Sequence, residues 1–415
     1  MVVLALLAGL VALAVLAALH WYAWRRLFRD TTSRPGIRRA GAVLLAAGLV
    51  LMIGAVVVER AGAPFWLQRA VAWPGFLWMV LSLYLVLALV VGEAVRPLLL
   101  RWTAARARGR EPVREETAES ETAESETAEP ETVKVPEEAA EPSRRVFVSR
   151  VVGGAAAAVA VGTVGYGTYG VLRGPTVKRV TVPLAKLPRA AHGFRIAVVS
   201  DVHLGPVLGR GFAQRVVDVV NSTQPDLIAV VGDLVDGSVE DLRPAAAPLR
   251  GLRARHGSFF VTGNHDYYSG ADAWVDEVRE LGLHPLRNAR VELGAFDLAG
   301  VDDVAGESEG HGPDFAAALG DRDRARAAVL LAHQPVVIHD AVRHGVDLQL
   351  SGHTHGGQLW PGNYLAELAN PTVAGLERYE DTQLYVSRGA GAWGPPTRVG
   401  APSDVTVVEL ASRQA

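Results

Sequence analysis

The sequence predicts an α/β domain preceded by helices that cross a membrane. From Arg179 onward, short Val- and Ile-rich runs alternate with amphipathic segments, which is the pattern of a fold built from strands and helices in turn. Before that region, three long apolar runs occupy the first hundred residues. The chain has 415 residues, too many for one ordinary domain, and 49% of them are hydrophobic.

The three apolar runs predict a transmembrane region over residues 1–104. They cover residues 2–19, 41–58 and 73–91, each close to the ~20 residues that a helix needs to cross a bilayer. A buried core helix is the alternative for any single run. Trp and Tyr near the ends of the runs favour spans, because these residues are enriched at membrane interfaces. A cleaved signal peptide does not explain the first run, whose positive charge follows the apolar residues.

The distribution of arginines predicts the orientation of these spans. Residues 25–39 hold six arginines, and residues 96–110 hold five. The connection between the second and third runs holds just Arg60 and Arg69. Arg-rich segments tend to stay in the cytoplasm, so both are expected there and the N-terminus outside.

Residues 105–146 predict an acidic, low-complexity linker. A unit Thr-Ala-Glu-Ser-Glu begins at Thr117 and Thr122, and recurs from Thr127 with Pro130 in place of Ser. Such sequence has too little apolar surface to form a core, so we expect a solvated, self-repelling linker.

Residues 147–174 predict a fourth membrane segment. Arg144 and Arg145 precede a Gly- and Ala-rich, weakly apolar stretch, which resembles a twin-arginine export signal. The alternative is an ordinary fourth span with a basic cytoplasmic flank. No clear cleavage site follows, so the segment is expected to remain as an anchor. Under either interpretation, residues 175–415 lie outside the cytoplasmic membrane.

Residues 175–415 carry the alternating pattern. Strands are predicted at 194–200, 227–231, 258–262, 328–332 and 348–350, with further strands within 383–410. Helices are predicted at 211–223, 271–281 and 335–344.

Residue types that bind metals follow each of the five strands. In order, they are Asp201 and His203; Asp233 and Asp236; Asn264, His265 and Asp266; His333; and His353 and His355. Sites in open α/β sheets form beyond the carboxyl ends of strands, so the five clusters are expected to meet in one crevice. The chain has no cysteine, so a metal there must bind through imidazole, carboxylate or amide groups.

These clusters resemble the motifs of the calcineurin-like metallophosphoesterase superfamily. The motifs occur in order as Asp-x-His at Asp201, Gly-Asp-x-x-Asp at Gly232, Gly-Asn-His-Asp at Gly263, a lone His333, and Gly-His-x-His at Gly352. The resemblance covers residues 179–410. It implies a four-layer sandwich, with two β-sheets flanked by helices, and a metal-dependent phosphoric ester hydrolase.

The resemblance implies a site for two divalent ions, with Mn, Fe and Zn all suitable. One ion would be bound by Asp201, His203 and His355. The other would be bound by Asn264, His333 and His353. Asp233 would bridge the two ions, with a water or hydroxide between them as the nucleophile.

The resemblance also assigns catalytic roles to residues that do not bind metal. His265 would protonate the leaving oxygen or stabilise its charge, and Asp236 would orient this histidine. Asp266 would support the loop.

One departure from the motifs bears on the substrate. Protein phosphatases of this superfamily continue Gly-Asp-x-x-Asp with an Arg, where this chain has Gly237. The segments 232–237, 263–268 and 352–359 are more similar to a bacterial membrane-associated branch, some of whose members carry a twin-arginine signal. That similarity implies phosphodiester or pyrophosphate substrates, including lipid-linked or nucleotide-sugar ones.

Four further residues are candidates for substrate contacts. Trp360 and Trp393 are expected either at the rim of the site or in packing. Arg388 and Arg398 are candidate phosphate contacts.

Three alternative functions differ in how well they fit the sequence. A phosphomonoesterase of the same fold stays open. A non-catalytic metal-binding scaffold is disfavoured, because such proteins tend to lose the His present here as His265. A sensor or transporter is disfavoured because the spans hold almost no ionisable residues. With a net charge of −3, no nucleic acid binding is expected.

Overall fold

The computed structural model describes residues 2–108 and 143–413. Most of the predicted acidic linker lies outside these residues. The chain divides into two compact units, which are described separately. One comprises Met1–Leu49 with Ser82–Val161, and the other comprises Val50–Leu81 with Gly162–Ala415.

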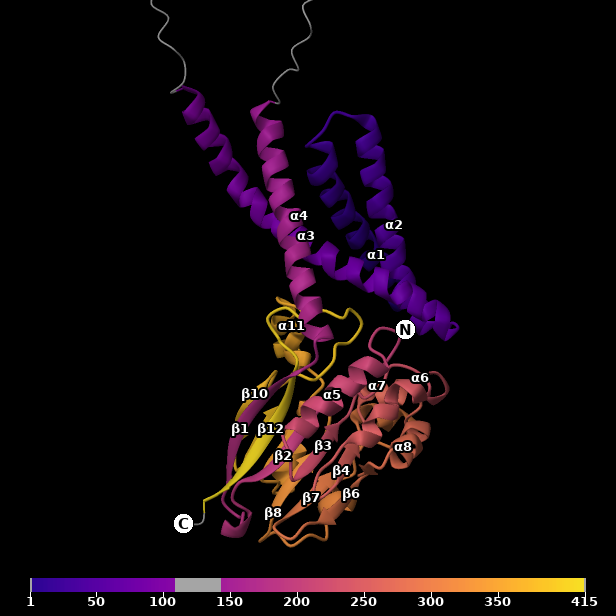
Figure 1. The fold of residues 1–415 in the computed structure, drawn as a ribbon, viewed down its shortest axis with the longest axis vertical. Coiled ribbons are helices and arrows are strands. Elements are labelled where there is room, and N and C mark those ends of the chain that lie inside the picture. The colour runs from indigo at the N-terminus through magenta and orange to yellow at the C-terminus, as the bar shows by residue number, and fades with distance from the viewer. Residues whose placement is uncertain (1, 109–142, 414–415) are drawn as a thin grey trace, which may run out of the picture. The chain divides into compact units, whose positions relative to one another are not determined.

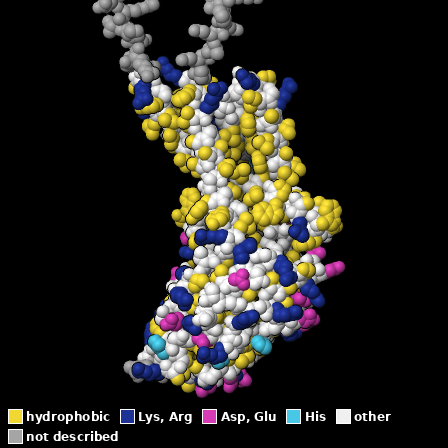
Figure 2. All heavy atoms as spheres, viewed as in Figure 1, with side chains coloured by type: hydrophobic (Ala, Val, Ile, Leu, Met, Phe, Trp, Pro, Cys, Tyr) yellow, Lys and Arg dark blue, Asp and Glu magenta, His cyan; other side chains and the backbone are white. Residues whose placement is uncertain are grey.

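Long apolar helices account for the first part of the chain (Figure 1). They are α1 (Val2–Trp24), followed by a π-helical turn at Arg25–Arg29, then α2 (Pro35–Arg60), α3 (Phe65–Arg108) and α4 (Arg144–Leu172). All four are long and apolar enough to cross a membrane. Figure 2 shows hydrophobic side chains gathered over these helices. Leu10, Val43 and Val90 are each more than half exposed, which suits contact with lipid rather than water.

The first β-sheet has six strands in the order β1-β12-β2-β3-β4-β5. Their bounds are Thr176–Leu184, Asp404–Ser412, Phe194–Val199, Leu227–Val231, Ser258–Val261 and His284–Pro285. Strand β12 is antiparallel to β2, and every other neighbouring pair is parallel. The carboxyl ends of β2, β3 and β4 therefore lie at the same edge of the sheet.

The second β-sheet also has six strands, in the order β10-β11-β9-β8-β7-β6. Their bounds are Gly375–Tyr379, Thr382–Val386, Leu348–Ser351, Ala327–Leu331, Phe296–Gly300 and Ala289–Glu292. The four inner strands are parallel, and each outermost strand is antiparallel to its neighbour.

Helices cover the outer face of each sheet. Helices α5 (Arg210–Ser222), α6 (Val239–Ala246) and α8 (Ala271–Glu280) pack on the first sheet, and α9 (Phe315–Leu319) and α10 (Ile338–Arg343) pack on the second. Two further helices, α7 (Asn264–Tyr268) and α11 (Gly362–Ala369), do not belong to these layers. Short 3-10 turns lie at Arg189–Ala191, Ala247–Gly251, Val304–Glu309, Pro335–Val337 and His355–Gly357.

Alternation along the strands builds three cores between these layers. In β2, Ile196 and Val198 pack between the two sheets, whereas Ala197 and Val199 face the helices. Residues of β7 and β8 meet the first sheet on one side and α9 and α10 on the other. The layers are helix, sheet, sheet and helix, so the predicted four-layer sandwich is confirmed.

Several elements differ from the sequence prediction. The helix predicted at 335–344 is a 3-10 turn followed by α10. The region 383–410 holds β11 and β12, joined by a long irregular connection. Strands β1, β6, β7 and β10 and helix α11 were not predicted.

Candidate metal centre

The predicted ligands lie at the carboxyl ends of strands from both sheets. Loops after β2, β3 and β4 bring them from the first sheet, and loops after β8 and β9 bring them from the second. Nine non-glycine residues of the described chain have positive φ. Five of these nine are Asp201, His203, Asp233, His353 and His355, with φ between 48° and 73°. Such backbone costs on the order of 1 kcal/mol a residue, so its concentration here marks a functional site.

Two glycines allow the ligand loops to approach one another. A Cβ at Gly352 would collide with the side chains of Ser200 and Asp201, and a Cβ at Gly263 would collide with Asp233. Glycine at these positions therefore allows the loop after β9 to approach the loop after β2, and the loop after β4 to approach the loop after β3.

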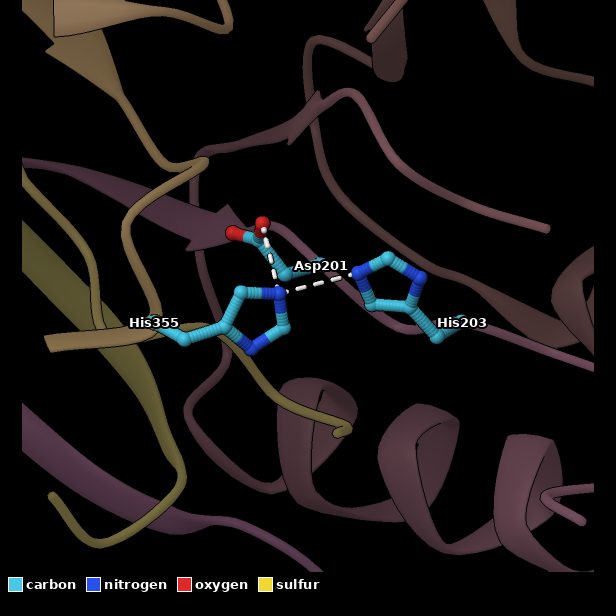
Figure 3. A group of neighbouring side chains, drawn as sticks. All are labelled: Asp201, His203 and His355. Carbon is cyan, nitrogen blue, oxygen red and sulfur yellow. Dashed lines mark hydrogen bonds and ion pairs between the residues drawn. The ribbon is translucent and has the colours of Figure 1, made fainter. Parts of the chain in front are cut away.

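The first group of ligands contains Asp201, His203 and His355. Figure 3 shows the side chains of Asp201 and His203, from the loop after β2, pointing toward that of His355 from another segment of the chain. Nε2 of His355 lies 2.9 Å from Nε2 of His203 and 3.3 Å from Oδ1 of Asp201. All three residues are buried. Two imidazole nitrogens and a carboxylate oxygen thus converge on one point, as a transition metal requires.

The second group contains Asp233, His333 and His353, with Asn264 beside them. Nε2 of His333 lies 3.1 Å from Oδ2 of Asp233, and Nδ1 of His353 lies 2.9 Å from Oδ1 of Asn264. Oδ2 of Asp233 also lies 3.7 Å from Nε2 of His203. Asp233 therefore stands between the two groups.

Two observations show that the side chains of these two groups suit metal ions. Nε2 of His333 is buried and makes no hydrogen bond within the described residues. Its Nδ1 donates to the carbonyl of Val231 at 2.9 Å, which leaves Nε2, 3.1 Å from Oδ2 of Asp233, as the ring atom that a metal ion would take. In addition, burial lowers the pKa of His203, but the surrounding carboxylates raise it to about 9. The cluster therefore favours positive charge, which metal ions would supply in place of protons.

Asp236 holds two histidines at once. Nδ1 of His203 donates to Oδ2 of Asp236 at 3.0 Å, and Nδ1 of His265 donates to Oδ1 at 2.6 Å. Burial raises the pKa of this carboxyl, but the two imidazoles outweigh burial and lower it to about 2. The sequence predicted only the contact with His265, so the bond to His203, a predicted metal ligand, is an added role.

His265 lies at the edge of the cluster. Its backbone N–H donates to Oδ1 of Asp233 at 2.8 Å, and its side chain is 17% exposed. Rings of Tyr268 and Trp393 lie 5.4 Å and 5.5 Å away. The ring nitrogen that faces away from Asp236 is therefore placed between the cluster and aromatic surface residues.

Asp266 joins the loops that follow β3 and β4. Its carboxylate accepts from the backbone N–H of Leu234 at 3.0 Å and from that of Gly263 at 2.8 Å. This geometry agrees with the predicted support of the loop.

Arg398 does not lie where a phosphate contact would be. It is buried, and its guanidinium donates to the carbonyl oxygens of Gly391 at 2.7 Å and His355 at 2.9 Å. Nη2 also lies 2.9 Å from Nδ1 of His355, which must accept because a guanidinium has no acceptor. Arg398 thus braces the His355 ring, a role that the sequence did not predict.

Other candidates lie as follows. Trp360 and Trp393 are about half exposed, which favours the rim over packing. Asp303 was missed by the sequence prediction, although it follows β7 at the same edge. Its Oδ1 accepts from Gln334, the neighbour of His333, at 2.9 Å.

Comparisons with known proteins identify relatives of the domain that holds this site. The family model for calcineurin-like phosphoesterases matches residues 194–357. The chain is 40% identical over 259 residues to a zebrafish (Danio rerio) transmembrane protein with a metallophosphoesterase domain, covering 59% of each chain. It is 39% identical over 247 residues to an uncharacterized metallophosphoesterase of Helicobacter pylori, covering 59% of this chain and 66% of that one.

The match to these two relatives spans less than two thirds of the length of either. A shorter relative is covered almost entirely. The chain is 36% identical over 239 residues to an uncharacterized metallophosphoesterase of Aquifex aeolicus, covering 56% of this chain and 91% of that one. Fold, motifs and relatives agree, and the chain belongs to the calcineurin-like metallophosphoesterase family.

Proposed function

We propose that this protein is a membrane-anchored phosphoesterase with two metal ions. The observation that carries the proposal is the position of Asp233, whose Oδ2 lies 3.1 Å from Nε2 of His333 and 3.7 Å from Nε2 of His203. One carboxylate is thereby shared by two sets of imidazoles. Asp201, His203 and His355 would hold one ion, and Asn264, His333 and His353 the other.

The ions would lower the pKa of a water molecule and offset the charge of the phosphoryl oxygens. The remaining chemistry belongs to side chains. His265 donates a proton to the leaving oxygen from the nitrogen that faces away from Asp236. Asp236 fixes the tautomer and orientation of that ring through the 2.6 Å bond to its Nδ1.

The substrate class we propose is a phosphodiester or pyrophosphate, with a lipid-linked or nucleotide-sugar group attached. Gly237 supports this class, because it leaves out the Arg with which protein phosphatases hold a phosphate. A cavity of about 720 Å³ beside the proposed metal centre supports a substrate that carries an apolar group. It is lined mainly by apolar side chains, including Phe65, Trp66, Trp73 and Val207, and its wall at Gly205 lies against Asp236. A phosphomonoesterase of the same fold is the alternative.

The proposal includes the placement in the membrane. The arginine distribution supports a location of residues 175–415 outside the cytoplasm, with residues 147–174 as a fourth span or a retained twin-arginine-like anchor. Four apolar helices and relatives named as transmembrane proteins support attachment to a membrane.

The test is a measurement of metal content and turnover on the full chain in detergent. Mass spectrometry of the Mn²⁺-loaded protein should find two ions per chain, and bis-p-nitrophenyl phosphate should be hydrolysed faster than p-nitrophenyl phosphate. Asp233→Asn should remove turnover and lower the metal content, whereas Asp276→Asn, on an exposed face of α8, should change neither. Turnover that survives chelation, or a strong preference for the monoester, would overturn the proposal.

A further inference from the structure

Helix α11 presents an apolar face that the described chain leaves uncovered. None of its eight residues is buried. Tyr364, Leu365 and Leu368 are 59%, 71% and 85% exposed. Spacings of one and four residues place these three on one side of the helix, with Asn363 and Glu367 on another side.

Backbone hydrogen bonds fix the start of α11, although its apolar face is exposed. The backbone N–H of Gly362 donates to Leu359 at 2.6 Å, and that of Trp360 donates to Val399 at 2.9 Å. The contrast with α5 is informative, because the apolar side chains Phe212 and Val216 of that helix are buried against the first sheet. An ordered helix with an exposed apolar face indicates a surface that is covered by a lipid bilayer or by another molecule.

The last turns of α4 lie beside the segment that positions α11. Oγ1 of Thr168 lies 2.7 Å from Oγ1 of Thr397, and the backbone N–H of Arg398 donates to Gly167. The next residue, Val399, forms a β-bridge with Leu359, and its carbonyl accepts from the backbone N–H of Trp360, two residues before α11. Figure 1 shows α11 and the end of α4 at the same end of the sheets.

Exposed aromatic residues mark the membrane level on α4. Tyr166 and Tyr169 are 80% and 63% exposed within its last two turns. Tyr and Trp are enriched where a span leaves the hydrocarbon core, so these turns indicate the interface. Trp360, half exposed, adds a third aromatic residue next to α11.

We propose that α11 lies in the membrane interface at the C-terminal end of α4, with Tyr364, Leu365 and Leu368 among the lipid acyl chains. The partner is the bilayer that holds this chain's own helices. Helix α11 carries Glu367 and no basic residue, so apolar insertion rather than attraction to anionic lipid accounts for the contact. The proposal does not depend on the phosphoesterase activity.

The experiment uses the absence of cysteine in the chain. The full chain carrying Leu368→Cys is labelled with a polarity-sensitive fluorophore and placed in phosphatidylcholine nanodiscs. Asp381→Cys, in the exposed turn between β10 and β11, is the matched control. Leu365→Cys repeats the measurement if the first label disturbs the helix.

For the labels at 365 and 368, we expect blue-shifted emission, iodide quenching reduced by about twofold or more, and quenching by brominated phosphatidylcholine. The label at 381 should remain open to iodide. Adding anionic phosphatidylglycerol should change none of these values. Iodide quenching equal to that at 381 would overturn the proposal. Shielding without quenching by brominated lipid would also overturn it, because a protein such as a second copy would then cover the face.

Discussion

At the scale of single residues, Asp236 connects the two halves of the proposed chemistry. The same carboxylate accepts from His203, a proposed metal ligand, and from His265, the proposed proton donor. Its side chain is only 11% exposed, so water does not readily replace it as the acceptor for either histidine. The loss of this charge should therefore affect metal binding and proton transfer together.

Asp236→Asn is predicted to lower turnover by at least about 10²-fold and to weaken metal binding by roughly 10- to 100-fold. The amide is close in size to the carboxylate but lacks its charge, so both imidazoles lose their anionic acceptor. Steady-state kinetics and metal titration of the purified variant would measure the two effects.

Asp276→Asn serves as the control, because Asp276 is an exposed carboxylate on α8. Comparable losses in the two variants would show that Asp236 has no special role. A loss of turnover with unchanged metal affinity would restrict its action to His265.

Protons should compete with metal at His203. The pKa of this histidine is raised to about 9, so in the metal-free protein its ring is protonated near neutral pH. A metal ion bound at the proposed ligand atom, Nε2, would displace that proton. Apparent Mn²⁺ affinity should therefore rise by up to about tenfold per pH unit and level off above about pH 9.

Calorimetric titration of the metal-free chain with Mn²⁺ at several pH values would measure this slope. Asp236→Asn removes a carboxylate that raises the pKa of His203, so its affinity should level off at lower pH. Affinity independent of pH in the unsubstituted chain would contradict the prediction.

At the scale of elements, the site depends on how closely the loops after β2 and β9 approach. Gly352→Ala should destabilise the protein by roughly 1–3 kcal/mol and lower its metal content, because the added methyl group collides with Ser200 and Asp201. Thermal unfolding and metal analysis would measure both. Gly294→Ala is the matched control, since its Cβ would meet no atom within 4 Å. Equal behaviour of the two variants would refute a requirement for glycine.

The sequence predicted the elements that have a clear hydrophobic pattern. Strands β2, β3, β4, β8 and β9 are short, mostly apolar runs, buried except for the first two residues of β2, so their hydrophobic residues identified them within about a residue. Strand β10 is mostly exposed, and β5 has two residues, so neither leaves a pattern. Helix α11 was missed because its apolar residues are not buried against a sheet.

The site likewise contains residues whose roles the sequence predicted and residues whose roles it did not. The predicted metal ligands directly follow strands, and the parallel order of those strands brings them together. The roles of Arg398 and Asp303 depend on contacts with distant parts of the chain. Arg398 meets His355 through a buried bond that no local spacing indicates. Such tertiary contacts could be found only from the fold.

At the scale of the whole molecule, the arginine distribution makes a prediction about sidedness. Because the chain has no cysteine, single cysteines report accessibility without background. Arg324→Cys, in the catalytic domain, should react with a membrane-impermeant maleimide on intact spheroplasts. Arg34→Cys, between α1 and α2, should react only after lysis. The opposite pattern would place the catalytic domain in the cytoplasm.

The connection between α4 and β1 is very short. Leu172 ends the helix and Thr176 begins the strand, so three residues join them and reach about 10 Å at most. With α4 in a bilayer, the catalytic domain would have no freedom to diffuse away from the lipid surface. Its encounters with a substrate in the same leaflet would take place in two dimensions. Turnover would then follow the number of substrate molecules per unit area of membrane, and dilution of the surrounding solution would leave it unchanged.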